Sequence, residues 1–319
     1  MKKESAALVV LAFAAIYIVW GTTYMAVLFG LESFPPFTLS ALRFAVSGVL
    51  LLGWCLLRGE RLPALRDWKV PVVSGIVMLV GGTGLVAWSE QYVPSGQAAI
   101  VIATEPFLFL LLDKKRWGYY FSRKWVPAGL LLGFSGIVLF FLFAATGHAG
   151  RVVAPYWKAI GIAVLFVSGI LWAGGSLYAK NRNPEHISNT LTTAMQLVAA
   201  GLFSALLGGI TGEWTHFAVA GITAKAWGGL LYLIVFGSII AYLAFTWLLS
   251  IRPPALVSTH TYVNPVVAVL MGWFVAHEPI TPMQVGALFL ILAGVMLVNK
   301  KPSATEAVTV REPAVATAQ

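Results

Sequence analysis

Charged residues are scarce in this sequence. They make up only 10% of its 319 residues, whereas 59% of the residues are hydrophobic. A soluble globular domain contains about 25% charged residues, and so few charges cannot cover the surface of a water-soluble protein of 34.3 kDa. The high hydrophobic content also excludes a disordered chain. The composition therefore predicts an all-α membrane protein that crosses the bilayer several times.

Cysteine and several catalytic motifs are also missing. Cys55 is the only cysteine, so one chain can form neither a disulfide framework nor a cysteine-based metal site. His277 and Glu278 begin a zinc-protease pattern, but position 281 is Thr281 instead of histidine. The sequence has no Walker lysine and no Gly-x-Ser-x-Gly motif. We therefore expect no enzyme activity, no metal, no cofactor and no direct use of ATP.

The net charge of +9 is explained by orientation in the membrane. The basic residues lie in short connectors between apolar segments and form no stripe of the kind that binds nucleic acid. Seventeen of the 21 Lys and Arg residues fall on one side of the predicted spans, three fall on the other side, and Arg43 lies within a span. Positive connectors stay in the cytoplasm, so we expect both termini there, with some affinity of the basic side for anionic membrane lipid.

Ten apolar segments are long enough to cross a membrane, which takes about 20 residues of helix. Met1, Lys2 and Lys3 imitate the start of a signal peptide, but the apolar stretch after them is too long for one and predicts an uncleaved first span. The ten predicted spans are Ala6–Leu31, Phe37–Leu57, Val70–Gln91, Ser95–Leu112, Trp125–Ala145, Trp157–Tyr178, Ile187–Ile210, Trp227–Ser250, Ala255–Ala276 and Pro282–Val298.

The two halves of the chain resemble each other. Trp20-Gly-Thr-Thr-Tyr24 corresponds to Trp172-Ala-Gly-Gly-Ser-Leu-Tyr178, Trp88 to Trp247, and Glu105-Pro106 to Asn264-Pro265. Five spans per half is an odd number, so the second repeat must enter the membrane inverted, as in secondary transporters with a site between the halves. The predicted units are a first five-helix repeat (1–145), a periplasmic linker (146–156), a second, inverted repeat (157–299) and a disordered cytoplasmic tail (300–319).

Several motifs carry a family resemblance. They are Trp20-Gly-Thr-Thr-Tyr24, Phe34-Pro35-Pro36, Leu42-Arg43-Phe44, Pro94-Ser95-Gly96-Gln97-Ala98-Ala99 and Tyr262-Val263-Asn264-Pro265-Val266-Val267-Ala268-Val269-Leu270, followed by Glu278. Over residues 8–298 the chain resembles EamA-type transporters of the drug/metabolite transporter superfamily. The resemblance implies ten helices as two inverted five-helix repeats around a central cavity, in a bacterial inner membrane, and export of amino acids or related metabolites. The chain departs from the family pattern at Tyr119, where the first repeat lacks the acidic residue that Glu278 supplies in the second.

Two ionisable residues, Arg43 and Glu105, lie clearly within predicted spans. A charge at the bilayer centre costs at least about 2.5–3.5 kcal/mol on insertion scales. Arg43 is therefore a candidate to bind a substrate carboxylate, and Glu105 to bind an ammonium group or relay protons. The alternative is that they pair with each other, or that Arg43 serves packing.

Further candidates follow from the repeat. Pro106 and Pro265 interrupt corresponding spans and are expected to act as hinges. His260 and Asn264 share one face of their span, which favours a polar lining. Aromatic walls suit amphipathic substrates, which adds Trp20, Tyr24, Trp88, Trp172 and Tyr178 to the candidates for substrate binding, with helix packing as the alternative for each.

These features together predict an inner-membrane secondary transporter. We expect export of amino acids or related small amphipathic metabolites, with broad specificity, by alternating access. The alternatives from the residues are a multidrug or toxic-cation exporter and a passive channel of the same fold, whereas a membrane-embedded enzyme lacks the necessary motifs. The expected partners are a small-molecule substrate and membrane lipid, without nucleic acid, and the chain is expected to act as a monomer or homodimer.

Overall fold

The structure is a computed structural model, and it describes residues 5–93, 98, 101–142, 154–276 and 281–300. Within these ranges the secondary structure is entirely helical, as the composition predicts. Most of the predicted linker 146–156, nearly all of the predicted tail 300–319, and Glu278 lie outside the described residues.

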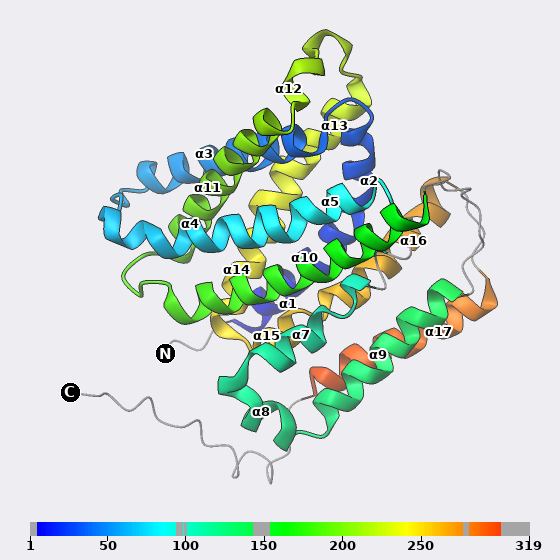
Figure 1. The fold of residues 1–319 in the computed structure, drawn as a ribbon. Helices are drawn as coiled ribbons and strands as arrows, with labels where there is room; N and C mark the ends of the chain where they lie inside the picture. Colours follow the sequence, from blue (N-terminus) through cyan, green and yellow to red (C-terminus); the bar gives the residue numbers. More distant parts are fainter. Residues whose placement is uncertain (1–4, 94–97, 99–100, 143–153, 277–280, 301–319) are drawn as a thin grey trace.

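In the first half, two spans contain π-helical segments in mid-course (Figure 1). The elements are α1 (Ala6–Ala14), a π segment (Ala15–Val19), α2 (Trp20–Leu31), α3 (Pro36–Leu57), a 3-10 turn (Leu65–Trp68), α4 (Lys69–Gly75), a π segment (Ile76–Gly84), α5 (Leu85–Ser89), α7 (Glu105–Leu112), a 3-10 turn (Lys114–Arg116), α8 (Trp117–Ser122) and α9 (Trp125–Leu142).

The second half has the same kind of organisation. Its elements are α10 (Pro155–Arg182), α11 (Asn189–Ile210), α12 (Glu213–His216), a 3-10 turn (Val219–Gly221), α13 (Ala224–Tyr232), a π segment (Leu233–Ala241), α14 (Tyr242–Ile251), α15 (Pro254–Val257), α16 (His260–Ala276) and α17 (Pro282–Val298). Local signals fix several helix starts: Pro36 and Pro155 begin α3 and α10, and Thr281 with Gln284 forms a capping box on α17.

Six helical stretches of the described chain are long and apolar enough to cross a membrane. They are Ala6–Leu31, Pro36–Leu57, Leu65–Ser89, Pro155–Arg182, Asn189–Ile210 and Ala224–Ile251. A seventh is possible if α8 and α9, which meet at a bend of 90°, count as one broken span. The remaining predicted spans are shorter or interrupted helices here, among them α7, α16 and α17. The prediction of ten spans is therefore supported only in part.

Helices from the two halves pack against each other in pairs. The closest contacts join α3 with α11 and α9 with α17, and further contacts join α2 with α13 and α10 with the π segment Ile76–Gly84. Figure 1 shows α9 and α17 side by side along one flank of the bundle, with α3 and α11 on the opposite flank. Each pair combines a first-half element with a second-half element, so the halves form one bundle.

Small residues allow the backbones of α3 and α11 to touch. A Cβ atom at Gly48 would lie 2.6 Å from the backbone nitrogen of Val198, and one at Gly201 would lie 2.4 Å from the backbone nitrogen of Ala45. The contact is reciprocal, because each glycine meets the residue that precedes the other by three positions. Small residues at a helix interface are the usual means of close packing in membranes.

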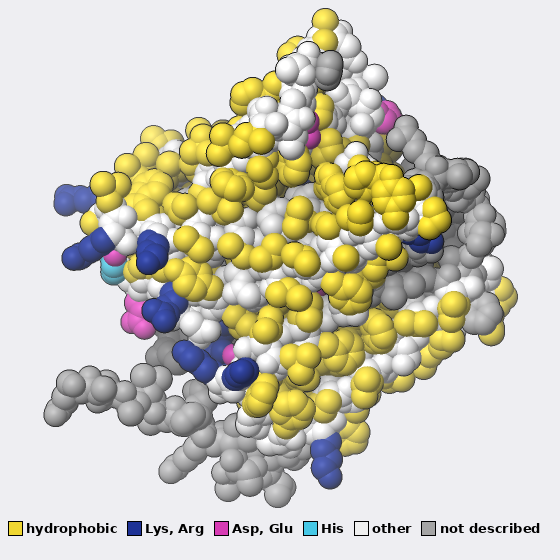
Figure 2. Space-filling model, in the orientation of Figure 1, with side chains coloured by type: hydrophobic (Ala, Val, Ile, Leu, Met, Phe, Trp, Pro, Cys, Tyr) yellow, Lys and Arg dark blue, Asp and Glu magenta, His cyan; other side chains and the backbone are white. Residues whose placement is uncertain are grey.

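One end of the bundle carries most of the basic side chains, and connectors meet there. The His186 ring contacts the Asp67 carboxylate at 3.3 Å, and Ser188 donates to Glu60 at 2.6 Å. In Figure 2, Lys and Arg side chains gather at the left end of the molecule, while hydrophobic side chains cover the face between the two ends. We call the end that carries these Lys and Arg side chains the basic end. An apolar belt of this kind is what lipid tails would contact.

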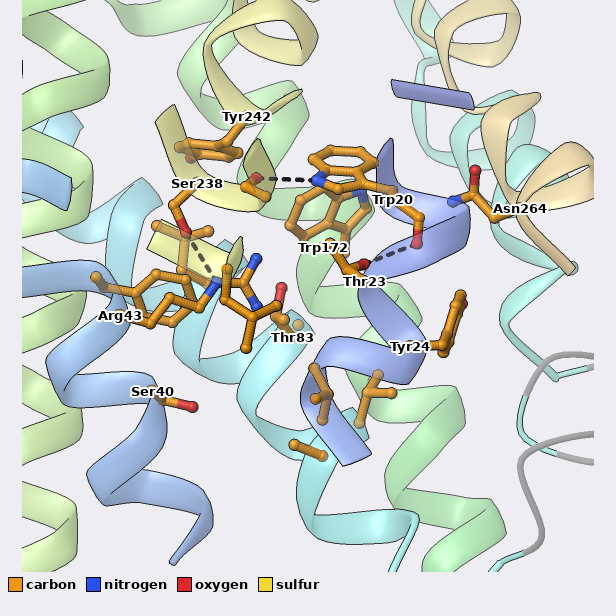
Figure 3. Close-up of a pocket in the computed structure, with 18 of the residues that line it drawn as sticks. Trp20, Thr23, Tyr24, Ser40, Arg43, Thr83, Trp172, Ser238, Tyr242 and Asn264 are labelled. Carbon is orange, nitrogen blue, oxygen red and sulfur yellow. Dashed lines mark hydrogen bonds between the residues drawn. The ribbon is translucent and has the colours of Figure 1, made fainter. Parts of the chain in front are cut away.

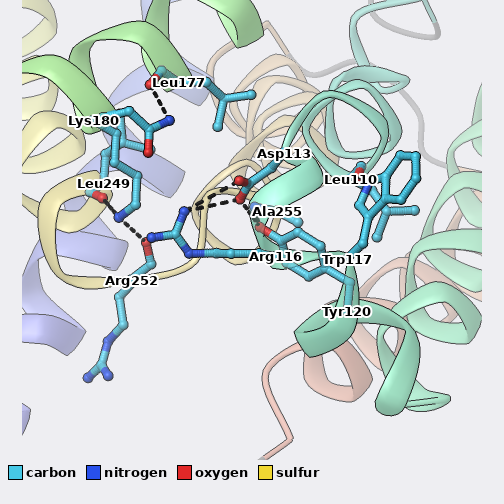
Figure 4. A network of polar contacts seen from close by, with 11 residues as sticks. Leu110, Asp113, Arg116, Trp117, Tyr120, Leu177, Lys180, Leu249, Arg252 and Ala255 are labelled. Atoms are coloured by element: carbon cyan, nitrogen blue, oxygen red, sulfur yellow. Dashed lines mark hydrogen bonds and ion pairs between the residues drawn. The ribbon is translucent and has the colours of Figure 1, made fainter. Parts of the chain in front are cut away.

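A polar network ties several helix ends together at the basic end (Figure 4). The buried Asp113 accepts a hydrogen bond from the Tyr120 hydroxyl at 2.8 Å and pairs with Arg116 at 3.4 Å. The backbone N–H of Ala255 donates to the Tyr120 hydroxyl at 3.5 Å. Lys180 donates to the carbonyl oxygens of Leu249 and Arg252. Through Ala255, the network joins α7 and α8 to the start of α15. Through Leu249 and Arg252, Lys180 joins α10 to the end of α14 and the connector after it.

The reciprocal glycine contact can be tested by stability. Gly201→Ala adds a methyl group where there is no room, and overpacking of this kind costs roughly 1–3 kcal/mol, so we expect a lower Tm in detergent. Gly53→Ala on α3 is the control, because no atom lies within 4 Å of a Cβ there, and it should hold or slightly raise the Tm. Equal Tm values for the two variants would contradict the close contact.

The orientation of the basic end can be tested by fusions. Because positive connectors remain in the cytoplasm, green fluorescent protein fused after Gln319 should fluoresce, and alkaline phosphatase at the same position should be inactive. The phosphatase inserted within 146–156 is the control and should be active. The reverse pattern would overturn the predicted orientation.

Candidate functional site

A central cavity lies between the two halves and contains about 1080 Å³ of space not filled by protein atoms. Its lining comes from α2, α3, α7, α10 and α16 and from both π segments Ile76–Gly84 and Leu233–Ala241, among other elements. Figure 3 shows labelled lining residues from both halves facing one another across this space. π segments inside helices often mark functional sites, and here both contribute to the same cavity.

Aromatic rings form one wall of the cavity. Trp20 lies 5.7 Å from Trp172 in an edge-to-face arrangement and 4.8 Å from His260, measured between ring centroids. Phe245 packs behind them, 5.1 Å from Trp172 and 5.7 Å from His260. Such distances are typical of stabilising aromatic contacts. Because the rings hold one another, they give the cavity a rigid apolar surface.

The two tryptophan N–H groups differ. The Trp20 indole nitrogen donates to the carbonyl oxygen of Gly237 at 3.1 Å, whereas the indole nitrogen of the buried Trp172 has no hydrogen-bond partner. A buried donor without a partner is costly. Trp172 lines the cavity, so this wall contains one indole N–H whose hydrogen bond is not made within the protein.

Arg43 provides the positive charge of the cavity. Its Nε donates to the Ser238 hydroxyl at 2.8 Å, and its guanidinium lies 5.0 Å from the Phe44 ring centroid. A Cβ at Gly237 would come within 3.1 Å of an Arg43 terminal nitrogen, so the glycine makes room for the guanidinium. No carboxylate of the described chain forms an ion pair with Arg43. The predicted alternative, an Arg43–Glu105 pair, is absent from these described contacts.

Two carboxylates provide the negative charge. Glu105 is 7% exposed, and its Oε2 atom has no hydrogen-bond partner. Glu90 also lines the cavity, and both carboxylates lie close enough to the Tyr24 hydroxyl to interact with it electrostatically. Glu105 stands in the first turn of α7, where the positive end of the helix dipole favours an anion. The cavity therefore contains one guanidinium and two carboxylates.

His260 and Asn264 lie on the same face of α16 and both reach the cavity, in agreement with their spacing. The His260 Nδ1 is 3.0 Å from the Val257 carbonyl oxygen; a proton on Nδ1 makes this a hydrogen bond and leaves Nε2 as an acceptor. With its amide oriented to satisfy its neighbours, the Asn264 amide nitrogen lies 2.9–3.2 Å from the carbonyl oxygens of Ile16, Tyr17 and His260, among which its two N–H bonds are shared. Asn264 thus joins α16 to the π segment Ala15–Val19.

Seven of the nine predicted substrate-binding residues line the cavity: Trp20, Tyr24, Arg43, Glu105, Trp172, His260 and Asn264. Trp88 and Tyr178 do not. In the segment around Trp88, the cavity is lined by Val86, Ala87 and Glu90. The Trp88 ring instead packs on the Tyr92 ring, with 4.9 Å between the ring centroids. Tyr178 stands six residues after Trp172 on α10, on another face and nearer the basic end.

The two predicted hinge prolines lie in different settings. Helix α7 begins at Glu105 after a turn at Ala103 and Thr104, so Pro106 occupies its first turn, where a missing N–H is tolerated. Pro265 lies inside α16, and the chain instead turns at Ser258 and Thr259, ahead of that helix. The expected interruption of both spans is present, but in the second half it precedes the proline by more than one turn. Their action as hinges remains a prediction.

Other residues that were not among the predicted binding residues also line the cavity, among them Glu90, Ser238 and Tyr242. Glu90 lies near the end of the predicted span Val70–Gln91, where a charged residue is not unusual. Ser238 belongs to the pair Gly237-Ser238 in the π segment Leu233–Ala241. A similar pair, Gly82-Thr83, lies in the π segment Ile76–Gly84. A glycine followed by a small polar residue thus occurs in both halves, and this repetition is the sequence signal that could have identified Ser238. In the described residues, no three His, Cys, Asp or Glu side chains are grouped so that they could hold a metal ion.

Comparison with known proteins gives a consistent result. The model of the EamA-like transporter family matches residues 7–142 and 159–300, one segment in each half. The uncharacterized inner membrane transporter YedA of Escherichia coli (strain K12) is 35% identical over 291 residues, which cover 90% of this chain and 89% of that protein. The uncharacterized transporter YvbV of Bacillus subtilis (strain 168) is 26% identical over 303 residues, 94% of each chain.

A crystal structure also matches, with a TM-score of 0.72 and 22% identity over 92% of this chain and 96% of that one; this likeness supports the fold alone. The family match and the YedA relative confirm the resemblance drawn from the sequence motifs.

The support of Arg43 by Ser238 can be tested by stability. Ser238→Ala leaves a buried guanidinium without its acceptor, and a hydrogen bond to a charged group contributes roughly 1.5–3 kcal/mol, so we expect a clear fall in Tm. Ser204→Ala is the matched control, because the buried Ser204 hydroxyl has no partner to lose. If Ser204→Ala is as destabilised as Ser238→Ala, the contact does not hold Arg43.

Proposed function

Because the chain belongs to the EamA-like transporter family, we propose that it is a secondary transporter of the inner membrane that exports amino acids or related small amphipathic metabolites by alternating access. One observation supports this most directly: a single cavity between the halves combines Arg43, Glu90 and Glu105 with an aromatic wall. Both termini are proposed to lie in the cytoplasm.

The charges of the cavity match those of a zwitterion. The guanidinium of Arg43 suits a carboxylate, and Glu105, with an unpaired oxygen, suits an ammonium group. The unpaired Trp172 N–H adds a donor. The rings of Trp20, Trp172 and His260 provide a surface for the apolar part of the same molecule. An α-amino acid carries all three features, so the cavity supports amino acids as the substrate class.

Alternating access is supported by the pairing of elements across the halves. The two π segments are offset by 157 residues at both their first and last positions, Ile76 with Leu233 and Gly84 with Ala241. The contact of α2 with α13 and that of α10 with Ile76–Gly84 correspond when the halves are exchanged. These correspondences favour ten helices in two inverted five-helix repeats. Inversion gives two conformations of similar energy that open to opposite sides.

A second candidate is export of organic cations. The cavity holds two carboxylates against one guanidinium, and no ion pair among the described residues neutralises either carboxylate. Aromatic walls bind cations through their ring faces. A lipophilic amine would use Glu90, Glu105 and the tryptophans and leave Arg43 unused. The two candidates therefore differ in their need for Arg43.

The experiment is counterflow in proteoliposomes, with a panel of labelled amino acids and organic amines, with and without an imposed pH gradient. A carrier should give saturable exchange of amino acids, and Glu105→Gln should lower it at least tenfold, because a charge-assisted hydrogen bond contributes roughly 1.5–3 kcal/mol. Glu32→Gln is the control, since Glu32 is exposed and pairs with Lys225 far from the cavity.

Other outcomes separate the alternatives. Exchange of amines that survives Arg43→Gln would favour the cation exporter, and flux that rises linearly with concentration would favour a channel. Exchange of amino acids unaffected by Glu105→Gln would contradict the role given to this carboxylate. A response to the imposed pH gradient that disappears in Glu105→Gln would assign proton coupling to the same residue.

A further inference from the structure

A second cavity lies between the central cavity and the basic end. It contains about 720 Å³ of space not filled by protein atoms, bounded by the last turns of α10, the connector to α11, the start of α11 and the end of α14. Its lining includes polar residues, among them Asn183, Asn189, Thr192 and Thr246, and reaches Lys180, which Figure 4 shows at the basic end. The Oδ1 atom of Asn183 is buried and has no partner.

The two cavities approach each other at α11 and at the π segment Ile76–Gly84. Met78 and Gln196 line the second cavity, whereas their sequence neighbours Leu79 and Leu197 line the central one. Tyr242 lines the central cavity from the opposite side. Adjacent residues of the same two segments therefore line different cavities, and Tyr242 of the central cavity contacts Gln196 of the second.

That contact is a short chain of buried hydrogen bonds. The Tyr242 hydroxyl donates to Gln196 Oε1 at 2.9 Å and lies 3.9 Å from Met78 Sδ. Gln196 Nε2 donates to the Ser74 hydroxyl at 2.9 Å. The side chains of Ser74, Gln196 and Tyr242 are at most 1% exposed. These hydrogen bonds link α14, α11 and α4 at a place where one partner, Tyr242, lines the central cavity and another, Gln196, lines the second.

We propose that the Tyr242–Gln196–Ser74 chain is a gate, and that the second cavity is the chamber through which small polar or zwitterionic solutes reach the central site from the basic end. The proposal rests on the proposed transport function. The asparagine and threonine side chains of the chamber can exchange hydrogen bonds with such a solute, and the unpaired Asn183 oxygen accepts one from an ammonium or hydroxyl group.

The gate is built on parts of the chain that can change conformation. Met78 lies in the π segment Ile76–Gly84, and Tyr242 directly follows the π segment Leu233–Ala241. Conversion of a π turn to an α turn shifts the residues beyond it by one position, which is a rotation of about 100° around the helix. Such a rotation would remove the Tyr242 hydroxyl from Gln196 and open the gate.

The central site contacts the gate directly. The ring of Tyr242 lies 6.4 Å from Trp172 and from Phe245, between ring centroids. Figure 3 shows Tyr242, Ser238 and Trp172 around the same space as Arg43. A solute that rests on Trp172 and Arg43 therefore changes the packing around Tyr242, which couples occupancy of the site to the gate. The Asp113–Tyr120 network on the other side of α10 holds the neighbouring helix ends together.

The gate can be tested by thiol labelling in sealed vesicles of either orientation. Cys55 is replaced by alanine, and Thr83→Cys reports on the central cavity, which Thr83 lines. A membrane-impermeant maleimide applied from the basic end should label Thr83→Cys slowly. Tyr242→Phe keeps the ring and removes the hydrogen bond, so we expect labelling from this end to rise about fivefold, the order expected for loss of one buried neutral hydrogen bond. Gln196→Ala should act in the same direction.

Two controls make the result specific. Tyr17→Phe removes another tyrosine hydrogen bond, to Thr259 at 2.8 Å, outside both cavities, and should leave labelling of Thr83→Cys unchanged. Asn183→Cys should label from the basic end in every background, which shows that the reagent reaches the chamber, and an unchanged Tm in detergent shows that each variant is folded. Unchanged labelling of Thr83→Cys in both Tyr242→Phe and Gln196→Ala, with Asn183→Cys still labelled, would overturn the gate. Because labelling requires no transport, absence of solute exchange by the unmodified protein would instead count against the proposed function.

Discussion

The structure depends on one constraint: charge has to be held at the depth of an otherwise apolar bundle. An arginine or a carboxylate at the centre of a helix costs at least about 2.5–3.5 kcal/mol on insertion scales. Arg43 is held by the Ser238 hydroxyl and the Phe44 ring, and Glu105 stands at the start of α7. Neither is neutralised by an ion pair in the described chain. Charges kept apart in this way retain their capacity to bind a ligand of opposite charge.

The bundle meets this constraint by dividing its helices into tight and adjustable parts. The α3–α11 contact is so close that Gly48 and Gly201 leave no room for a methyl group. The same is true between α9 and α17, where a Cβ at Gly294 would lie 2.5 Å from the backbone nitrogen of Gly133. Packed interfaces of this kind move as units. The π segments Ile76–Gly84 and Leu233–Ala241, by contrast, line the cavity. A change of helical register in them alters which side chains face it.

Much of the cavity lining could be predicted from the sequence, because charged and polar residues are rare in an apolar chain and therefore stand out. Arg43 and Glu105 were evident since a buried charge is rare, and His260 and Asn264 since polar side chains four positions apart share a helix face. Trp88 and Tyr178 do not line the cavity, for a geometric reason. A motif gives the depth of a residue along its helix but not its direction around the axis, and the π segment Ile76–Gly84 shifts that direction.

Pro265 and Tyr242 illustrate a further limit of the sequence. A proline removes one hydrogen bond, but the position of the turn depends on the tertiary contacts of its neighbours: Asn264 binds carbonyl groups of the π segment Ala15–Val19 and thereby holds α16 through Pro265. Tyr242 is one of ten tyrosines, and nothing in its sequence context marks it. Its importance comes from Gln196 and Ser74, which lie 46 and 168 residues away.

The two halves differ in the hydrogen bonding of their corresponding tryptophans, Trp20 and Trp172. The Trp20 N–H donates to the carbonyl oxygen of Gly237, in the π segment Leu233–Ala241. Trp172 packs on Gly82, in the π segment Ile76–Gly84, and its N–H is unpaired. In the proposed inverted repeat, Trp20 and Gly237 correspond to Trp172 and Gly82. Exchange of the two halves would therefore pair the Trp172 N–H with Gly82 and release that of Trp20. Trp172 lines the cavity and its indole N–H is unpaired, so a ligand that satisfies this donor would stabilise the present conformation, and loss of that ligand would favour the exchanged one.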